Sequence, residues 1–361
     1  RKLGLVLRPE FEHAKLAADL ASAVNRRFFF FDGTTRRGIA KAVEDDFIEL
    51  DLHPRYHANV YRLMEVVRAI GIKQESSESH KRLTLLASRL ANPATAADAA
   101  LQLEAIGESA IPTLMEGTRS ANPELRFYAA QALAYLDRVE AIEPLEEAAR
   151  EVAAFRHDAL LALQELPRQA SVDALKRLMD EASLETRYGS FCAIRRRKDA
   201  RGSLGGRDLG PMNLHQIPSA APPAIVISLR EQPEVVLFGS PADMKITGVV
   251  MAPNALMLKP VPEDPSKVEV IRFSPGEEDR RTTVDASVAS VIQGITLVGG
   301  AYGDVVAALR MAKDQGFLSD QLAIDPLPRP LRTYHRDQSG DEDEEDVDAE
   351  DDPADDESAD N

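Results

Sequence analysis

The side chains of this 361-residue sequence that could do chemistry occur in small, separated groups. His53 and His57 lie four residues apart, a spacing that can place two imidazoles on one helix face around a metal ion. Pro54 lies between them, and no cysteine or cluster of further ligands is near in the sequence. Because proline breaks a helix interior, we expect these histidines in a solvated loop and predict no metal site.

Carboxylates, glycines and a third histidine give no stronger indication of catalysis. Asp45 and Asp46, like the acidic residues of 277–279, lie in polar loop segments, and neighbours in sequence do not face each other across a cleft. Residues 202–210 are glycine-rich but lack the Lys-Ser/Thr pair of a P-loop. His157 lies in a predicted helix, where packing explains it. The sequence therefore predicts no catalytic residue, no cofactor-binding residue, no metal ligand and no enzymatic activity.

The middle of the chain, residues 99–197, repeats with a period of about 30 residues. Apolar residues recur at helical spacing, so each unit predicts two short helices, for example residues 126–136 and 142–153. The recurring positions are Ala99, Ala129 and Ala159, then Leu103, Leu133 and Leu163, then Leu114, Leu145 and Leu175. Such a period is typical of stacked helix pairs, and about three units resemble the HEAT repeat in its short bacterial form.

Arginines open successive units at positions 126, 156 and 187. We expect Arg126, Arg156 and Arg187 to bond between neighbouring units of the stack, with partner binding as the alternative. Cys192, the single cysteine, lies within a repeat helix and is expected in the core. The basic run at residues 195–198 ends the last repeat, where cations suit a helix C-terminus.

The charge of the chain is concentrated at one end. The formal net charge is −17, and the 14 acidic residues between positions 341 and 360 account for all but −3 of it. Such a tail should be disordered, as a solubilising appendage or as a ligand for calcium or a basic partner. The nearly neutral remainder disfavours nucleic acid as a partner. No apolar run approaches 18 residues, so no membrane span is predicted.

The segment before the repeats predicts a small α+β unit. Residues 3–7 and 47–52 alternate as strands do, and residues 11–28 and 58–70 have the spacing of amphipathic helices. Four phenylalanines at 28–31 are expected in a core or an interface.

The segment after the repeats predicts a linker and a second, strand-rich unit. Residues 199–223 are rich in Gly, Pro and Ser, as linkers are. Two β-branched runs around a polar turn, 224–229 and 235–238, predict a hairpin. A helix at 284–295 is expected to end at Gly299-Gly300, with Asp304 as the N-cap of the next helix. Further strands are predicted at residues 245–251, 255–260, 267–273 and 322–324.

Three features of the flanks form a pattern: residues 11–28, which contain Ala-Ser-Ala-Val-Asn, "FIELDLHP" at 47–54, and the order helix, glycine break, helix, glycine, short strand in 287–324. This pattern resembles one family, the flagellar basal-body P-ring protein. It covers residues 1–72 and 222–325. The family's next hairpin is missing after residue 72, and the one at 224–238 resembles it. The resemblance implies a subunit that assembles laterally into a ring around the flagellar rod.

The predicted fold class is α+β: a split α/β-sandwich-like body, an α-solenoid of HEAT-like helix pairs inserted into it, and a disordered acidic tail. The predicted domains are a ring-type module at 1–74, the repeat insertion at 75–198, a linker at 199–221, a module completing the body at 222–336, and the tail at 337–361.

The predicted function is a non-enzymatic structural subunit of the periplasmic basal body, without cofactors, nucleic acid or a membrane span. Its expected partners are copies of itself, rod or envelope proteins, and an unknown protein on the repeat surface. The alternative is a HEAT-repeat adaptor between proteins, unrelated to motility. A lyase of the kind built from HEAT-like repeats is a third hypothesis, which no set of acid, base and nucleophile supports.

Overall fold

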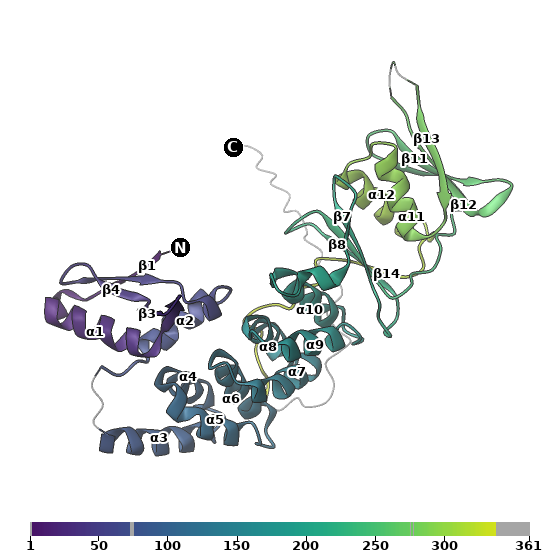
Figure 1. Cartoon of the computed structure of the whole chain (residues 1–361). Coiled ribbons are helices and arrows are strands. Elements are labelled where there is room, and N and C mark those ends of the chain that lie inside the picture. Colours follow the sequence, from purple (N-terminus) through teal and green to yellow (C-terminus); the bar gives the residue numbers. More distant parts are fainter. Residues whose placement is uncertain (1, 73–75, 275, 277, 337–361) are drawn as a thin grey trace, which may run out of the picture.

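The chain forms three consecutive parts, an N-terminal module, a helical stack and a C-terminal module (Figure 1). The computed structural model describes residues 2–72, 76–274, 276 and 278–336, and the side chains of 76–79 are not described. The predicted acidic tail at 337–361 lies outside the described residues. None of the described helices is both long and apolar enough to cross a membrane.

The N-terminal module is a three-stranded sheet covered by a helix, with a separate hairpin. The antiparallel sheet has the order β1-β5-β4, and β2 pairs with β3. Ala17, Ala21 and Val24 are the buried face of α1, and such small side chains let the helix approach the sheet closely. Its elements are β1 (Lys2–Val6), α1 (Ala14–Arg27), β2 (Phe29–Asp32), β3 (Thr35–Gly38), β4 (Ala40–Ala42), β5 (Phe47–Asp51) and α2 (Val60–Arg68).

The helical stack has two layers. The even-numbered helices contact one another in sequence, α4 to α6 to α8 to α10, and the odd-numbered helices lie on their outer side. The helices are α3 (Ser76–Leu90), α4 (Ala96–Ile106), α5 (Ile111–Gly117), α6 (Pro123–Tyr135), α7 (Ile142–Glu151), α8 (Ala153–Glu165), α9 (Gln169–Leu178) and α10 (Leu184–Arg196). This arrangement confirms the predicted solenoid of helix pairs.

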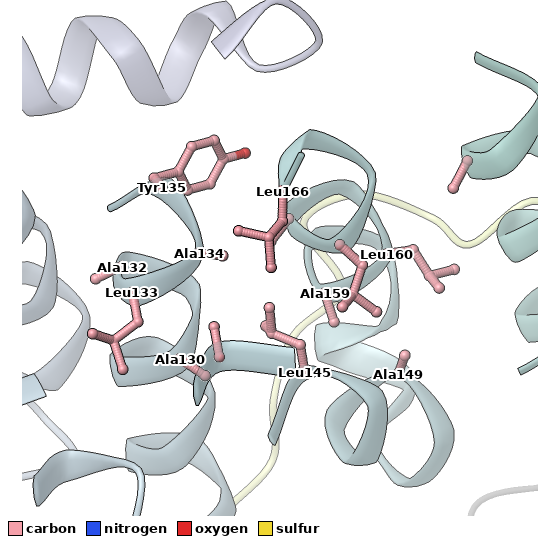
Figure 2. Packing of buried hydrophobic residues seen from close by; sticks show 14 of the residues in the cluster. Ala130, Ala132, Leu133, Ala134, Tyr135, Leu145, Ala149, Ala159, Leu160 and Leu166 are labelled. Atoms are coloured by element: carbon pink, nitrogen blue, oxygen red, sulfur yellow. The ribbon is translucent and has the colours of Figure 1, made fainter. Parts of the chain in front are cut away.

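Alanine and leucine alternate in the core of the stack (Figure 2). Leu133 from α6, Leu145 from α7 and Leu163 from α8 are fully buried, and Ala130 and Ala159 fill the narrower spaces between them. Because each helix pair buries its apolar face only against its neighbours, the stack depends on contacts between successive units. Ala159 and the three leucines are positions that repeat in the sequence, and Ala130 lies next to the repeating Ala129.

The C-terminal module contains two sheets and two helices. The five-stranded sheet has the order β14-β8-β9-β7-β6, and the antiparallel four-stranded sheet has the order β10-β11-β12-β13. The elements are β6 (Arg207–Asp208), β7 (Asn213–Ile217), β8 (Ala224–Ser228), β9 (Glu234–Phe238), β10 (Val250–Ala252), β11 (Leu256–Val261), β12 (Asp264–Arg272), β13 (Arg280–Asp285), α11 (Val288–Leu297), α12 (Tyr302–Asp314) and β14 (Gln321–Ile324).

The central strands β8 and β9 are buried on both faces. Val226 and Phe238 belong to the core that continues into the helical stack, whereas Ile225, Ile227 and Leu237 belong to the core with α11 and α12. Side chains of a strand alternate between its faces, so one sheet joins the stack to the rest of the module. The predicted hairpin at 224–238 is confirmed by the antiparallel pairing of β8 with β9.

Several sequence predictions about the flanks are corrected. The strands of the two flanks belong to different sheets, so the C-terminal module does not complete a split body. Residues 199–221, predicted as a linker, contain β7, which pairs in parallel with the buried β9. The strand predicted at 245–251 is shorter and is β10. The helix predicted to begin at residue 284 begins instead at Val288, with Ser287 as its N-cap, because residues 284 and 285 are the end of β13. Asp304 is not the N-cap but accepts from the backbone N–H of Ala301 three residues earlier.

A buried ion pair joins the N-terminal module to the stack. Glu104 of α4 is fully buried and accepts from Nη2 of Arg62 at 2.6 Å and from the hydroxyl of Tyr56 at 2.5 Å. Tyr56 also stacks on Tyr135 of α6, with 4.7 Å between ring centroids. Burial and the nearby Glu104 carboxylate raise the pKa of Tyr56. The Glu104 carboxylate, the Arg62 guanidinium and the Tyr56 hydroxyl therefore each have a partner from the other part.

A second buried ion pair closes the other end of the stack. Glu234, the first residue of β9, is fully buried and accepts from Arg195 of α10. The Phe191 ring of α10 contacts the His215 ring of β7 edge to face at a centroid distance of 4.9 Å. Because a solenoid end that remains open exposes apolar surface, the two modules act as caps.

We predict that Glu104→Ala weakens the protein strongly. The substitution leaves the Arg62 guanidinium and the Tyr56 hydroxyl without their partner in a buried site, a change that costs about 3–5 kcal/mol in comparable proteins. Denaturant unfolding followed by circular dichroism measures it.

The matched control is Glu116→Ala. The carboxylate of Glu116 pairs with Arg119 at an exposed position, where pairs contribute at most about 1 kcal/mol. Equal unfolding midpoints for the two variants would show that the junction is not held by Glu104.

Candidate functional site

An open cleft lies between the N-terminal module and one edge of the stack. Its volume is about 1120 Å³. One wall is formed by the end of α1, the β2–β3 hairpin and the residues around His53, and the other by the C-terminal ends of α4, α6 and α8. Six arginines line it, against three carboxylates. The arginines are Arg26, Arg27, Arg36, Arg55, Arg138 and Arg168, and the carboxylates belong to Glu108, Asp137 and Glu165. We call this site the arginine cleft.

Three arginines of the cleft surround the C-terminal end of α1. Arg36 stacks over the Phe29 ring at 3.8 Å and donates to the carbonyl oxygens of Asn25 and Arg26. The Nε of Arg27 donates to the carbonyl oxygen of Glu104 at 2.9 Å, across the junction with α4. Cations at a helix C-terminus offset its partial negative charge, so these side chains stabilise α1 as well as line the cleft.

Asp137 holds two further arginines in place. It accepts from Arg55 of the N-terminal module and from Arg168 of the stack, both at 2.9 Å. The backbone of Asp137 has a φ of 63°, a left-handed conformation that Asp adopts more easily than most residues. The turn after α6 thereby presents one carboxylate to arginines from both walls.

The cleft has cationic donors that its own residues do not satisfy. Among the described residues, Nη2 of Arg27 and Nε of Arg138 are buried and have no hydrogen-bond partner. Burial raises the pKa of the Glu165 carboxyl. The cleft is thus electropositive in a chain that is acidic as a whole.

The paired histidines of the sequence do not form a site. His53 caps the short helical turn Pro54–Tyr56 and packs against the Phe28 ring, whereas His57 is exposed at the end of that turn. Within the described residues, no group of three or more His, Cys, Asp or Glu side chains could hold a metal ion. His157 bonds to the adjacent Asp158 at 2.9 Å.

The three repeated arginines bond within the stack, as the sequence predicted. Nε of Arg156 donates to the carbonyl oxygen of Ala149 at 3.0 Å, and its Nη1 donates to Glu185 of the next unit at 3.1 Å. Arg126 also bonds to carbonyl oxygens before its helix, those of Ser120 and Ala121, but its carboxylate partner is Glu147 in α7 of its own unit. Arg187 donates to the carbonyl oxygens of Ala182 and Pro222, and thus ties α10 to the C-terminal module.

Three of the four residues in the basic run at 195–198 bond within the protein, and Lys198 is exposed. Arg195 and Arg196 pair with Glu231, and Arg197 is buried, with its Nη1 donating to the carbonyl oxygen of Leu166 at 2.6 Å. Cys192 is buried, as expected, and burial raises the pKa of its thiol.

Sequence reasoning missed the arginine cleft. Its arginines come from positions as distant as Arg26 and Arg168, and only folding brings them together. One local signal was available, because basic pairs at 26–27 and 36–37 flank the phenylalanine run at 28–31. That run was predicted to lie in a core or an interface. It runs from the core to the surface, since Phe28 is buried and Phe31 is 66% exposed.

Comparisons with known proteins support the stack alone. Residues 81–164 match the family of HEAT repeats. No curated protein and no solved structure matches the chain. The resemblance of the middle segment to HEAT repeats is thereby confirmed, and the P-ring resemblance of the flanks receives no support from these comparisons.

We predict that His53 makes the protein less stable at mildly acidic pH. Burial, with the nearby Arg55, lowers the pKa of His53 to about 4, against about 6.5 in an unfolded chain. Between these values the unfolded chain binds the additional proton, so stability falls as the pH drops from 6.5 to 4.

Thermal unfolding across that pH interval tests the effect. His53→Gln should lose less stability than the wild type as the pH falls, whereas His57→Gln at the exposed position should follow the wild type. A His53→Gln profile parallel to the wild type would contradict a buried neutral imidazole.

Proposed function

We propose that this chain is a non-enzymatic protein-binding scaffold, whose arginine cleft holds an acidic segment of a partner protein. The observation that carries the proposal is the open cleft of about 1120 Å³ with six arginines on its walls, at the edge of a stack that matches HEAT repeats. HEAT repeats form extended surfaces for protein partners.

The chemistry of the cleft favours carboxylates on an extended chain. Guanidinium groups bind carboxylates through paired hydrogen bonds, and those of Arg26 and Arg36 are exposed on one wall, whereas Arg168 lies across from them. Side chains of Phe30 and Phe31 add apolar surface beside Arg36. Such a mixed wall accommodates a peptide with alternating acidic and apolar side chains.

The test is the binding of a fluorescent 20-residue polyglutamate peptide to protein ending at Arg336, so that the acidic residues 341–360 cannot compete. Arg26→Glu with Arg36→Glu should weaken binding at least about tenfold, the effect of about 1.4 kcal/mol. Because both side chains also bond near the C-terminal end of α1, circular dichroism checks that the double variant is folded. Binding should also fall with added salt.

The control carries the same change of charge elsewhere. Arg37→Glu with Arg119→Glu alters two exposed arginines that pair locally with Asp32 and Glu116 and do not line the cleft. An equal loss of binding in the control variant would mean that the peptide senses net charge and not the cleft.

A second candidate function is the ring subunit that the sequence resemblance implies, located in the periplasmic basal body. One observation favours lateral assembly of copies. Among the described strands, β1 pairs only with β5, so its other edge is free, and Val6 on it is 71% exposed. Free strand edges are templates for pairing with another chain.

The ring hypothesis predicts that the purified protein forms closed symmetric particles. Light scattering and negative-stain microscopy should then show a discrete large assembly that Val6→Pro in β1 dissolves. The N–H of Leu7 donates to Asp46 beside β5, so the N–H of the preceding Val6 faces the free edge, where proline removes a donor. A monomer at all accessible concentrations would contradict the ring and leave the scaffold proposal intact.

A further inference from the structure

The last described segment of the chain crosses the stack on the edge opposite the arginine cleft. After β14, residues 326–336 run along the N-terminal ends of α10, α8 and α6 (Figure 1). We call residues 328–336 the strap. The cleft lies at the C-terminal ends of α4, α6 and α8, so the two features are separate.

Side chains at alternate positions anchor the strap. Arg332 donates to Glu185 of α10 at 3.2 Å, and Arg336 donates to both oxygens of Glu124 in α6 at 3.0 and 3.1 Å. Between them, the ring of Tyr334 lies 4.7 Å from the ring of Phe155 in α8. This period of two is that of an extended chain lying on a surface.

The surface under the strap repeats with the stack. Glu124 and Glu185 each lie two residues before a repeat arginine, Arg126 and Arg187, in the first turns of α6 and α10. Carboxylates in the first turn of a helix are stabilised by its dipole. The surface under the strap is therefore acidic even when the strap is absent.

The strap makes few contacts with the stack for a segment of nine residues. Among the described residues, none of its backbone groups takes part in a backbone–backbone hydrogen bond, and Leu331 is 94% exposed. Its attachment rests on two ion pairs, a hydrogen bond from Arg336 to the carbonyl oxygen of Pro93, one aromatic contact and the buried Pro328 against Gly189. An extended ligand with these few anchors can be exchanged for another of the same pattern.

We propose that the surface formed by Glu124, Phe155 and Glu185 is a second protein-binding site, which the strap occupies as an internal ligand. Its partner is an extended protein segment with basic, aromatic and basic side chains at alternate positions. Tethering gives the strap an effective concentration in the millimolar range, so a partner binds when its own affinity or local concentration exceeds that competition.

The experiment measures binding of a labelled peptide with the sequence of residues 326–336 to the full-length chain by fluorescence anisotropy. Arg332→Ala, Tyr334→Ala and Arg336→Ala together should free the surface, and this triple variant should bind the peptide at least ten times more tightly than the wild type. Arg329→Ala is the matched control, since Arg329 is exposed and has no ion pair with any described residue.

Two further comparisons make the result specific. Adding Glu124→Gln and Glu185→Gln to the triple variant should abolish binding of the peptide. A scrambled peptide of the same composition tests for attraction by charge alone, because the chain is acidic, and it should not bind. Circular dichroism checks that each variant is folded. If the folded triple variant does not bind the peptide, or binds the scrambled one equally, the strap is a fixed part of the fold and the inference is overturned.

Discussion

The fold depends on two buried arginine–glutamate pairs, one at each end of the helical stack. Arg62 with Glu104 and Arg195 with Glu234 join side chains from different parts of the chain, and both carboxylates are fully buried. Breaking such a pair leaves a charge without a partner in a site that water does not reach. The pairs therefore fix how each module is oriented on the stack.

This orientation determines what the edges of the stack can bind. The even-numbered helices place their C-terminal ends along one edge and their N-terminal ends along the other. The N-terminal module faces the first edge and adds arginines to it, which creates the cationic cleft. The opposite edge carries the acidic first turns of α6 and α10, which receive the basic strap. Two binding surfaces of opposite charge thus follow from one arrangement of helices.

The sequence predicted the elements better than their assembly. The period near 30 identified the helix pairs, because the same Ala and Leu positions must pack in every unit, and Arg126, Arg156 and Arg187 bond as expected. The sequence also predicted the strand at 47–52, because its apolar and polar residues alternate, and the hairpin at 224–238, because its two strands are mostly apolar.

Sheet membership and the cleft could not be predicted, because both depend on contacts between distant segments. β7 lies in a segment with the composition of a linker, and its partner β9 follows after another strand. The cleft needs Arg26 and Arg168 on facing walls, and the spacing of residues in the sequence does not indicate that these two arginines lie near each other. The strap was missed for the same reason, since its anchors Glu124 and Glu185 lie far upstream of Arg332 and Arg336.

Native-state hydrogen exchange tests most directly whether the N-terminal module and the stack form one cooperative unit. The buried pair between Arg62 and Glu104 predicts that the most protected amides of α2 and α4 open with the same free energy. Free energies for α2 that are several kcal/mol below those of α4 would contradict it, because the module would then open while the stack stays folded.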